Sequence, residues 1–248
     1  MFGKKNVTAV IAEFVGTAVL TMLVLTVQRS TIGVPFFIAA AAGLVVIIMM
    51  IALIDVSGAN FNPALTLALW TARKASTARA IFYIGAQLLG GWAAYYLYTY
   101  LVNTKLTPIG GHYAPRILVA EAFGAAIFAF VWAASMYQKQ SSTVRSTIAG
   151  IGFMIGMIAA SSAAIGIINP AVALGVRAWV WGTYVLGPVL GAVVGVNLYA
   201  LLFASDDKNN SLKASIASVT ASITGTKKTD SSKSSSSKSS SRRTSAKK

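Results

Sequence analysis

The sequence predicts an all-α membrane protein in which six transmembrane helices and two half-helices form an inverted repeat. The first observation behind this prediction is composition: 56% of the 248 residues are hydrophobic and only 11% are charged. Such a chain is too apolar for a domain with a wet surface. The apolar residues also fall in blocks of about 20, the length of helix that spans a hydrocarbon core of ~30 Å. These blocks form helices because lipid offers no water to an unpaired backbone.

Six apolar blocks have the length of a full span, and two have about half that length. The first block follows a lysine pair and resembles a signal peptide. It is long, however, it contains Glu13, and no small-residue cleavage pattern follows it, so we expect a retained span. The full spans are expected at about 7–28, 36–54, 77–101, 116–137, 144–165 and 180–203. The half-spans, at 62–72 and 169–178, each begin with Asn-Pro-Ala.

The second observation is an internal repeat, which divides the chain into two related halves. The matching segments are 12–16 with 120–124, 62–65 with 169–172, and 86–90 with 187–191. Each half holds three spans and one half-span, and an odd number of spans gives the two halves opposite orientations. Asn-Pro alone is an ordinary helix start, with Asn as the N-cap and Pro in the first turn. Two copies at the same place in a repeat indicate more than capping.

Positive charge gathers on one side of the predicted membrane. With the N-terminus inside, the inner side receives most of the loop Lys and Arg, as cytoplasmic loops usually do. Residues 204–248 hold ten Lys or Arg and three Asp, and so contribute +7 of the net charge of +15. We expect this Ser- and Lys-rich segment to be a disordered cytoplasmic tail, because it cannot bury enough apolar surface to fold. Contact with anionic lipid of the inner leaflet is the alternative. This distribution argues against a nucleic-acid partner.

The two half-helices form the predicted site. Entering from opposite faces, they meet N-terminus to N-terminus near the membrane midplane, and each N-terminus carries roughly +0.5 of an elementary charge. Together they repel cations, including a hopping proton, without blocking a neutral molecule. The side chains of Asn62 and Asn169 can donate amide hydrogens to a passing oxygen. The site residues are Asn62, Pro63, Ala64, Asn169, Pro170 and Ala171.

Glu13 and Glu121 are carboxylates within predicted spans, and such residues are functional candidates by default. One interpretation is a pair of acids for catalysis or proton relay. The other is that each carboxylate accepts hydrogen bonds from the irregular backbone that leads into a half-helix. The symmetric placement of the two residues favours the second. With one His and no Cys in the chain, we expect no catalytic nucleophile, metal site or cofactor, and no enzyme.

Taken together, these motifs resemble the aquaporin, or major intrinsic protein, family over about residues 7–203. The residues that carry the resemblance are Ala12-Glu13-Phe14-Val15-Gly16-Thr17, Ser57-Gly58-Ala59-Asn60-Phe61-Asn62-Pro63-Ala64, Tyr83-Ile84, Ala86-Gln87, the second Asn-Pro-Ala, and Gly187-Pro188. The resemblance implies an aquaporin-like right-handed bundle, with a channel domain at 1–203 made of repeats at about 7–101 and 116–203. It also implies passive conduction of water or small uncharged solutes such as glycerol. The expected partners are the lipid bilayer and three further copies in a homotetramer of the cell membrane, with both termini cytoplasmic.

Two departures from the family pattern concern selectivity. Asn60 stands where the family usually has His, and Val172 stands where it usually has Arg after the second Asn-Pro-Ala. Arg177, five residues beyond Val172, is rotated by about 140° around a helix and does not replace that Arg directly. By resemblance, the outer selectivity filter consists of Ala42, Met157, Gly166 and Val172. We expect this apolar constriction to be wider and less polar than that of a strict water channel.

A secondary active transporter is the main alternative, because inverted repeats and broken helices occur in that class too. It would need coupling-ion ligands or titratable groups near the midplane, and none are apparent apart from the two Glu residues. An intramembrane enzyme fits less well, since no nucleophile–base pair or metal cluster is visible. A purely structural protein remains an alternative if the pore is occluded.

Overall fold

The computed structural model describes residues 3–204, and every structural statement below refers to that part of the chain. Nearly all of the predicted tail, 204–248, lies outside the described residues. The elements, in chain order, are α1 (Lys4–Gln28), α2 (Pro35–Ser57), α3 (Pro63–Thr71), α4 (Thr77–Val102), α5 (Pro115–Tyr137), α6 (Ser142–Ala160), α7 (Pro170–Gly175), the π-helix η1 (Trp181–Leu186) and α8 (Gly187–Phe203).

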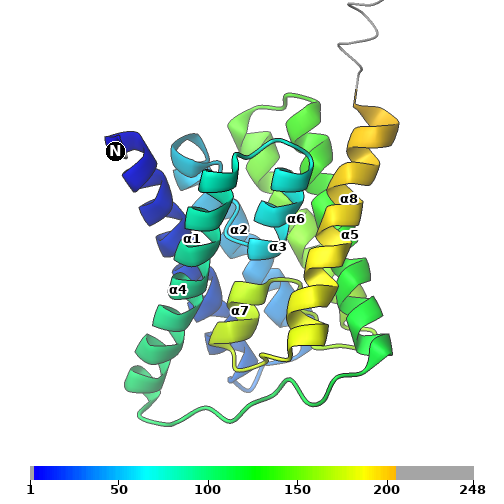
Figure 1. Cartoon of the computed structure of the whole chain (residues 1–248). Coiled ribbons are helices and arrows are strands. Elements are labelled where there is room, and N and C mark those ends of the chain that lie inside the picture. The colour runs from blue at the N-terminus through cyan, green and yellow to red at the C-terminus, as the bar shows by residue number, and fades with distance from the viewer. Residues whose placement is uncertain (1–2, 205–248) are drawn as a thin grey trace, which may run out of the picture. The chain divides into compact units, whose positions relative to one another are not determined.

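The bundle confirms the predicted fold class, with long helices surrounding two short ones. Helices α3 and α7 lie in the interior, and α3 is nearer to the end of the bundle that carries the N-terminus (Figure 1). Helix α3 packs against α8 of the second repeat, and α7 packs against α4 of the first. Each half-helix is therefore held by a long helix from the other repeat, which joins the two repeats into one bundle.

Five helical segments are long and apolar enough to cross a membrane, as judged by length and composition among the described residues. They are α1, α2, α5, α6 and the combined segment Trp181–Phe203. Helix α4 has the length, with 26 residues. It is more polar because it contains Gln87, an arginine and five tyrosines. Its packing against α1, α3 and α7 places it among the other long helices, so α4 counts as the sixth span by position.

The helix boundaries agree with the predicted spans within a few residues, with two exceptions. The predicted span 144–165 is too long, because α6 ends at Ala160. The predicted half-helix 169–178 is also too long, because α7 covers only Pro170–Gly175. The cause of the first error is Gly166, which adopts a left-handed φ of 72° within an irregular but apolar segment. Hydrophobicity there reports burial, and it does not report helix.

The last span begins with a π-helix, whereas its counterpart in the first repeat, α4, is a continuous α-helix. Pro188 explains the difference, because it has no N–H to donate to the carbonyl of Tyr184 one α-turn earlier. The π-helix η1 ends directly before Gly187 and Pro188, which open α8. π-turns of this kind occur where the α-helical hydrogen-bond ladder is interrupted.

Small residues allow the long helices to approach closely. A Cβ atom on Gly124 of α5 would overlap the carbonyl oxygen of Gly156 on α6. In the same way, a Cβ on Gly191 of α8 would overlap the carbonyl oxygen of Ala122 on α5. Close contact through small residues is how helices associate in lipid, where the hydrophobic effect gives no preference for one apolar partner over another.

Candidate functional site

Each half-helix begins at an Asn that caps it. Asn62 has an extended backbone and its Oδ1 accepts from the backbone N–H of Ala64 at 2.9 Å. Asn169 is equivalent, with its Oδ1 accepting from Ala171 at 3.0 Å and from Val172 at 3.4 Å. Pro63 and Pro170 occupy the first helical positions, where no N–H is needed. The capping function thus uses only the oxygen of each side chain and leaves the amide nitrogen for another partner.

The two amide nitrogens bind across the repeat. Asn62 Nδ2 donates to the carbonyl oxygen of Ile168 at 3.1 Å, and Asn169 Nδ2 donates to that of Phe61 at 2.9 Å. Phe61 and Ile168 are the residues directly before the two Asn. The structure therefore brings together two motifs that lie more than a hundred residues apart. An amide group carries two hydrogens, so each of these donations occupies one of them.

The carbonyls that accept these bonds come from backbone in an unusual conformation. Phe61 and Ile168 both have φ of 49°, in the left-handed region that residues with a Cβ seldom adopt. Such a conformation persists only when its surroundings hold it. Here the ring of Phe61 fills the space that Gly16 leaves open on α1. The matching angles show that both half-helix entries follow the same path.

Glu13, fully buried on α1, holds the first entry. Its Oε1 accepts from Asn60 N at 3.0 Å and from Ser57 Oγ at 2.7 Å. Its Oε2 accepts from Phe61 N and from Gln87 Nε2, both at 2.7 Å. Four donors thus satisfy this carboxylate, two from the backbone before α3 and two from side chains.

Glu121, fully buried on α5, holds the second entry with backbone groups. Its Oε1 accepts from Gly166 N and Ile167 N, each at 3.0 Å, and its Oε2 accepts from Ile168 N at 2.7 Å. These contacts favour the interpretation in which each carboxylate binds irregular backbone. Within residues 3–204, no group of three His, Cys, Asp or Glu is placed to hold a metal ion.

Several polar residues join the first entry without having been assigned a role by sequence reasoning. Gln87 Nε2 also donates to Thr66 Oγ1 at 2.9 Å, and Asn60 Nδ2 donates to the same oxygen at 3.2 Å. The Tyr83 hydroxyl donates to the carbonyl of Ser57 at 2.8 Å. The available signal was Gln87 itself, a polar side chain in a membrane span, since polar as well as charged residues there are costly unless they are bonded.

The candidate filter residues come from four segments. Ala42 lies on α2, Met157 on α6 and Val172 on α7, and their side chains are 0%, 2% and 1% exposed. All three belong to one buried apolar cluster. Gly166 lies against Met157, since a Cβ on Gly166 would overlap the Met157 carbonyl oxygen. A water-sized sphere therefore barely reaches these side chains in this structure. The predicted width of the constriction stays a prediction.

Arg177 lies away from the position of the missing filter Arg. It is exposed, and its guanidinium lies over the ring of Tyr95 on α4, 5.6 Å from the ring centre. Its backbone also has a left-handed φ of 67°, and its carbonyl accepts from Ile109 N at 3.0 Å. These contacts join Arg177 to the end of the first repeat, while Val172 is buried inside the bundle.

Long helices in an inverted repeat, with two capped half-helices between them, define a multi-pass membrane protein with an aquaporin-like fold. The model of the major intrinsic protein family matches residues 3–223, and the chain belongs to this family.

Relatives with known names are similar to much of the chain. Aquaporin Z of Photorhabdus laumondii is 28% identical over 223 residues, which cover 78% of this chain and 96% of that protein. Human aquaporin-4 is 30% identical over 220 residues, covering 80% of this chain and 68% of that one. The X-ray structure of the aquaglyceroporin from Plasmodium falciparum matches with a TM-score of 0.65 and 21% identity, over 79% of this chain and 96% of that one. This last likeness concerns the fold alone.

Proposed function

We propose that this protein is a passive channel through which water and small uncharged solutes such as glycerol cross the membrane. Membership of the major intrinsic protein family supports this function, as do the relatives named aquaporins. The observation that carries the proposal is the reciprocal pair of hydrogen bonds from Asn62 to Ile168 and from Asn169 to Phe61. This pair holds the N-termini of α3 and α7 next to each other, which is the geometry that the proposed mechanism requires.

The proposed mechanism uses fixed partial charges and two amide donors. The N-termini of two facing half-helices present positive potential, which opposes the entry of cations. Each Asn amide has a second hydrogen beyond the one bound to the opposite repeat, and this hydrogen can bind a passing oxygen. A water oxygen that accepts from both Asn62 and Asn169 directs its own hydrogens away from them. Neighbouring waters then cannot pass a proton through this point.

In this mechanism Glu13 and Glu121 act as anchors for the half-helices. Each carboxylate is occupied by at least three donors, so little acceptor capacity is left for a permeating molecule. Their role is to hold the left-handed backbone at Phe61 and Ile168, whose carbonyls orient the Asn amides. No protonation step at either carboxylate is part of the transport cycle.

Selectivity is assigned to Ala42, Met157, Gly166 and Val172. None of these side chains offers a charge or an aromatic ring, so the filter would not discriminate against the carbon backbone of glycerol as a charged filter does. The exclusion of cations then depends mainly on the half-helix termini. We further assign the channel to residues 1–203 in a homotetramer of the cell membrane, with both termini and the tail 204–248 in the cytoplasm.

Stopped-flow light scattering on proteoliposomes tests this function. Liposomes that contain the protein are expected to shrink and recover faster than empty liposomes when challenged with water, glycerol and urea gradients in parallel. Glycerol flux indifferent to proton or sodium gradients is expected of a channel. Uptake that depends on such a gradient would show a secondary active transporter instead. Fast water flux with glycerol and urea fully excluded would contradict the proposed wide filter.

A further inference from the structure

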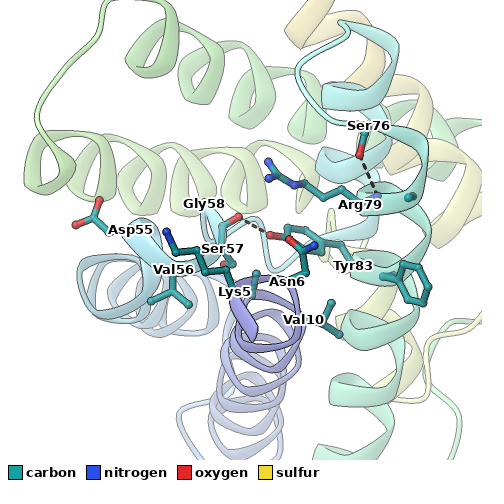
Figure 2. Close-up of a pocket in the computed structure, with 13 residues that line it drawn as sticks. Lys5, Asn6, Val10, Asp55, Val56, Ser57, Gly58, Ser76, Arg79 and Tyr83 are labelled. Atoms are coloured by element: carbon teal, nitrogen blue, oxygen red, sulfur yellow. Dashed lines mark hydrogen bonds between the residues drawn. The ribbon is translucent and has the colours of Figure 1, made fainter. Parts of the chain in front are cut away.

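A cavity of about 500 Å³ opens at the end of the bundle where α1 begins (Figure 2). Its polar lining consists of Lys5 and Asn6 of α1, Ser57 and Gly58 at the end of α2, and Ser76 and Arg79 at the start of α4. Every lining residue falls between positions 5 and 83, within the first repeat. The cavity is therefore separate from the half-helix site, which both repeats build.

The cavity carries positive charge. Figure 2 shows Lys5 and Arg79 on two different sides of the cavity. Asp55 also lines it, but its carboxylate accepts from Ser142 Oγ of α6 at 3.1 Å, and within the described residues it forms no ion pair with Lys5 or Arg79. The N-termini of α1 and α4 add partial positive charge at the same end. This arrangement suits an anionic group with several oxygens, such as a phosphate ester.

An apolar groove continues from the cavity along the outside of α1 and α4. Two hollows of about 520 Å³ and 220 Å³ share Val10 and Phe82 with the cavity. They are lined by Asn6, Val7, Val10, Ile11, Phe14, Ile81, Phe82, Gly85, Ala86 and Leu89. From Lys5 to Phe14 a helix rises by about 14 Å, which is close to half of a ~30 Å hydrocarbon core. The groove thus has the length of one leaflet.

We propose that the cavity and the groove together bind one anionic phospholipid. The phosphate lies beside Lys5 and Arg79, and an acyl chain lies between α1 and α4. A soluble anion would leave the apolar groove unused. A zwitterionic choline lipid would bring a cation next to two cationic side chains. The charged mouth and the adjoining groove fit both parts of one anionic lipid.

The proposed lipid lies next to the contacts that hold α3. Ser57 and Tyr83 line the cavity, and the Tyr83 hydroxyl donates to the Ser57 carbonyl. Ser57 Oγ in turn donates to Glu13, which binds the backbone before α3. A bound headgroup therefore contacts residues that are one hydrogen bond away from the anchor of the first half-helix. We expect the lipid to raise the melting temperature of the detergent-solubilised protein.

Native mass spectrometry of the full-length protein, titrated with phosphatidylglycerol and with phosphatidylcholine, tests the headgroup site. The double variant Lys5→Gln/Arg79→Gln is expected to bind phosphatidylglycerol about 30-fold more weakly, as two lost surface charges imply. The matched control is Arg73→Asn/Lys139→Asn, at two exposed left-handed positions that do not line the cavity and that Asn tolerates. Both double variants keep the basic residues of 204–248, so tail binding cancels. Equal affinity for the two lipids, or equal losses in both variants, would overturn the proposal.

A second variant tests the groove. Nothing lies within 4 Å of the position that a Cβ would take at Gly85, so Gly85→Leu fills the groove without displacing a helix. We expect it to weaken phosphatidylglycerol binding about 10-fold, because several methylenes of the acyl chain lose their burial. Unchanged lipid affinity in Gly85→Leu, with displacement of the lipid by inorganic phosphate, would identify a soluble anion as the ligand and refute the lipid. A change of oligomeric mass in Gly85→Leu would identify a second copy of the chain as the occupant and refute it as well.

Discussion

The two half-helix entries follow the same backbone path but are held by different chemistry. At the first entry, two of the four donors to Glu13 are the side chains of Ser57 and Gln87. At the second, all three donors to Glu121 belong to the backbone. Counting from each Asn, and from the matching segments of the last span in each repeat, gives the counterparts. Asn60, Thr66 and Gln87 of the first repeat correspond to Ile167, Ala173 and Pro188 of the second.

This difference teaches that a repeat can conserve a geometry while changing what stabilises it. The first entry is part of a polar network that joins α1, α3 and α4 through Glu13, Thr66 and Gln87. The second entry is surrounded by apolar side chains, and its stability depends on peptide groups and on Gly166. We therefore expect the first entry to respond to side-chain changes, and the second to respond to changes in its carboxylate and its backbone.

The largest expected effect is the loss of the carboxylate at the second entry. Glu121→Leu keeps a similar side-chain volume but leaves three buried N–H groups without an acceptor, at a cost of about 5 kcal/mol. Glu13→Leu leaves two backbone N–H groups, while Gln87 keeps its bond to Thr66, so about 3 kcal/mol is expected. Yield of monodisperse protein and melting temperature in detergent measure both. A more severe loss in Glu13→Leu would reverse the proposed contrast.

Gly166→Ala is expected to have the next largest effect. Gly166 has φ of 72°, and a Cβ there would overlap Ser161 Oγ and the Met157 carbonyl. The strain of the left-handed region and this overlap together should cost about 3 kcal/mol. Gly58 is the matched control, with φ of 89° but open space around a Cβ. Gly58→Ala should cost only about 1 kcal/mol, for the backbone alone. Equal shifts of the melting temperature would mean that packing at Gly166 contributes nothing.

Gln87→Met tests the polar network at the first entry. Methionine has a similar length but cannot donate to Glu13 or Thr66, so the loss should be about 2 kcal/mol. The control is Leu89→Met on the same helix, where the side chain is exposed and no hydrogen bond is at stake. Melting temperatures of the two variants in the same detergent give the comparison. A Gln87→Met protein as stable as the control would show that backbone donors alone hold Glu13.

These contrasts also mark how far the sequence could be interpreted. The apolar blocks predict the helices because lipid demands internal hydrogen bonding, and the repeated Asn-Pro-Ala predicts both half-helix starts. The end of α6 was not predictable from hydrophobicity, since Ile165, Ile167 and Ile168 are apolar yet irregular. Donors to Glu13 come from residues 44 to 74 positions away, and only the fold determines which of them meet. The cavity at Lys5 and Arg79 depends on the spacing of helices, which no local pattern encodes.

The smallest expected effect is that of Asn60→Ile, which introduces the residue type found at Ile167 of the second repeat. The backbone N–H of Asn60 still donates to Glu13 in this variant, because that bond does not involve the side chain. Only the 3.2 Å bond from Nδ2 to Thr66 is lost, and Gln87 donates to the same Thr66 oxygen at 2.9 Å. The cost should therefore stay below about 1 kcal/mol in the melting temperature analysis. A loss as large as that of Gln87→Met would mean that the two donors to Thr66 are not redundant, and that the first entry tolerates no step toward the apolar chemistry of the second.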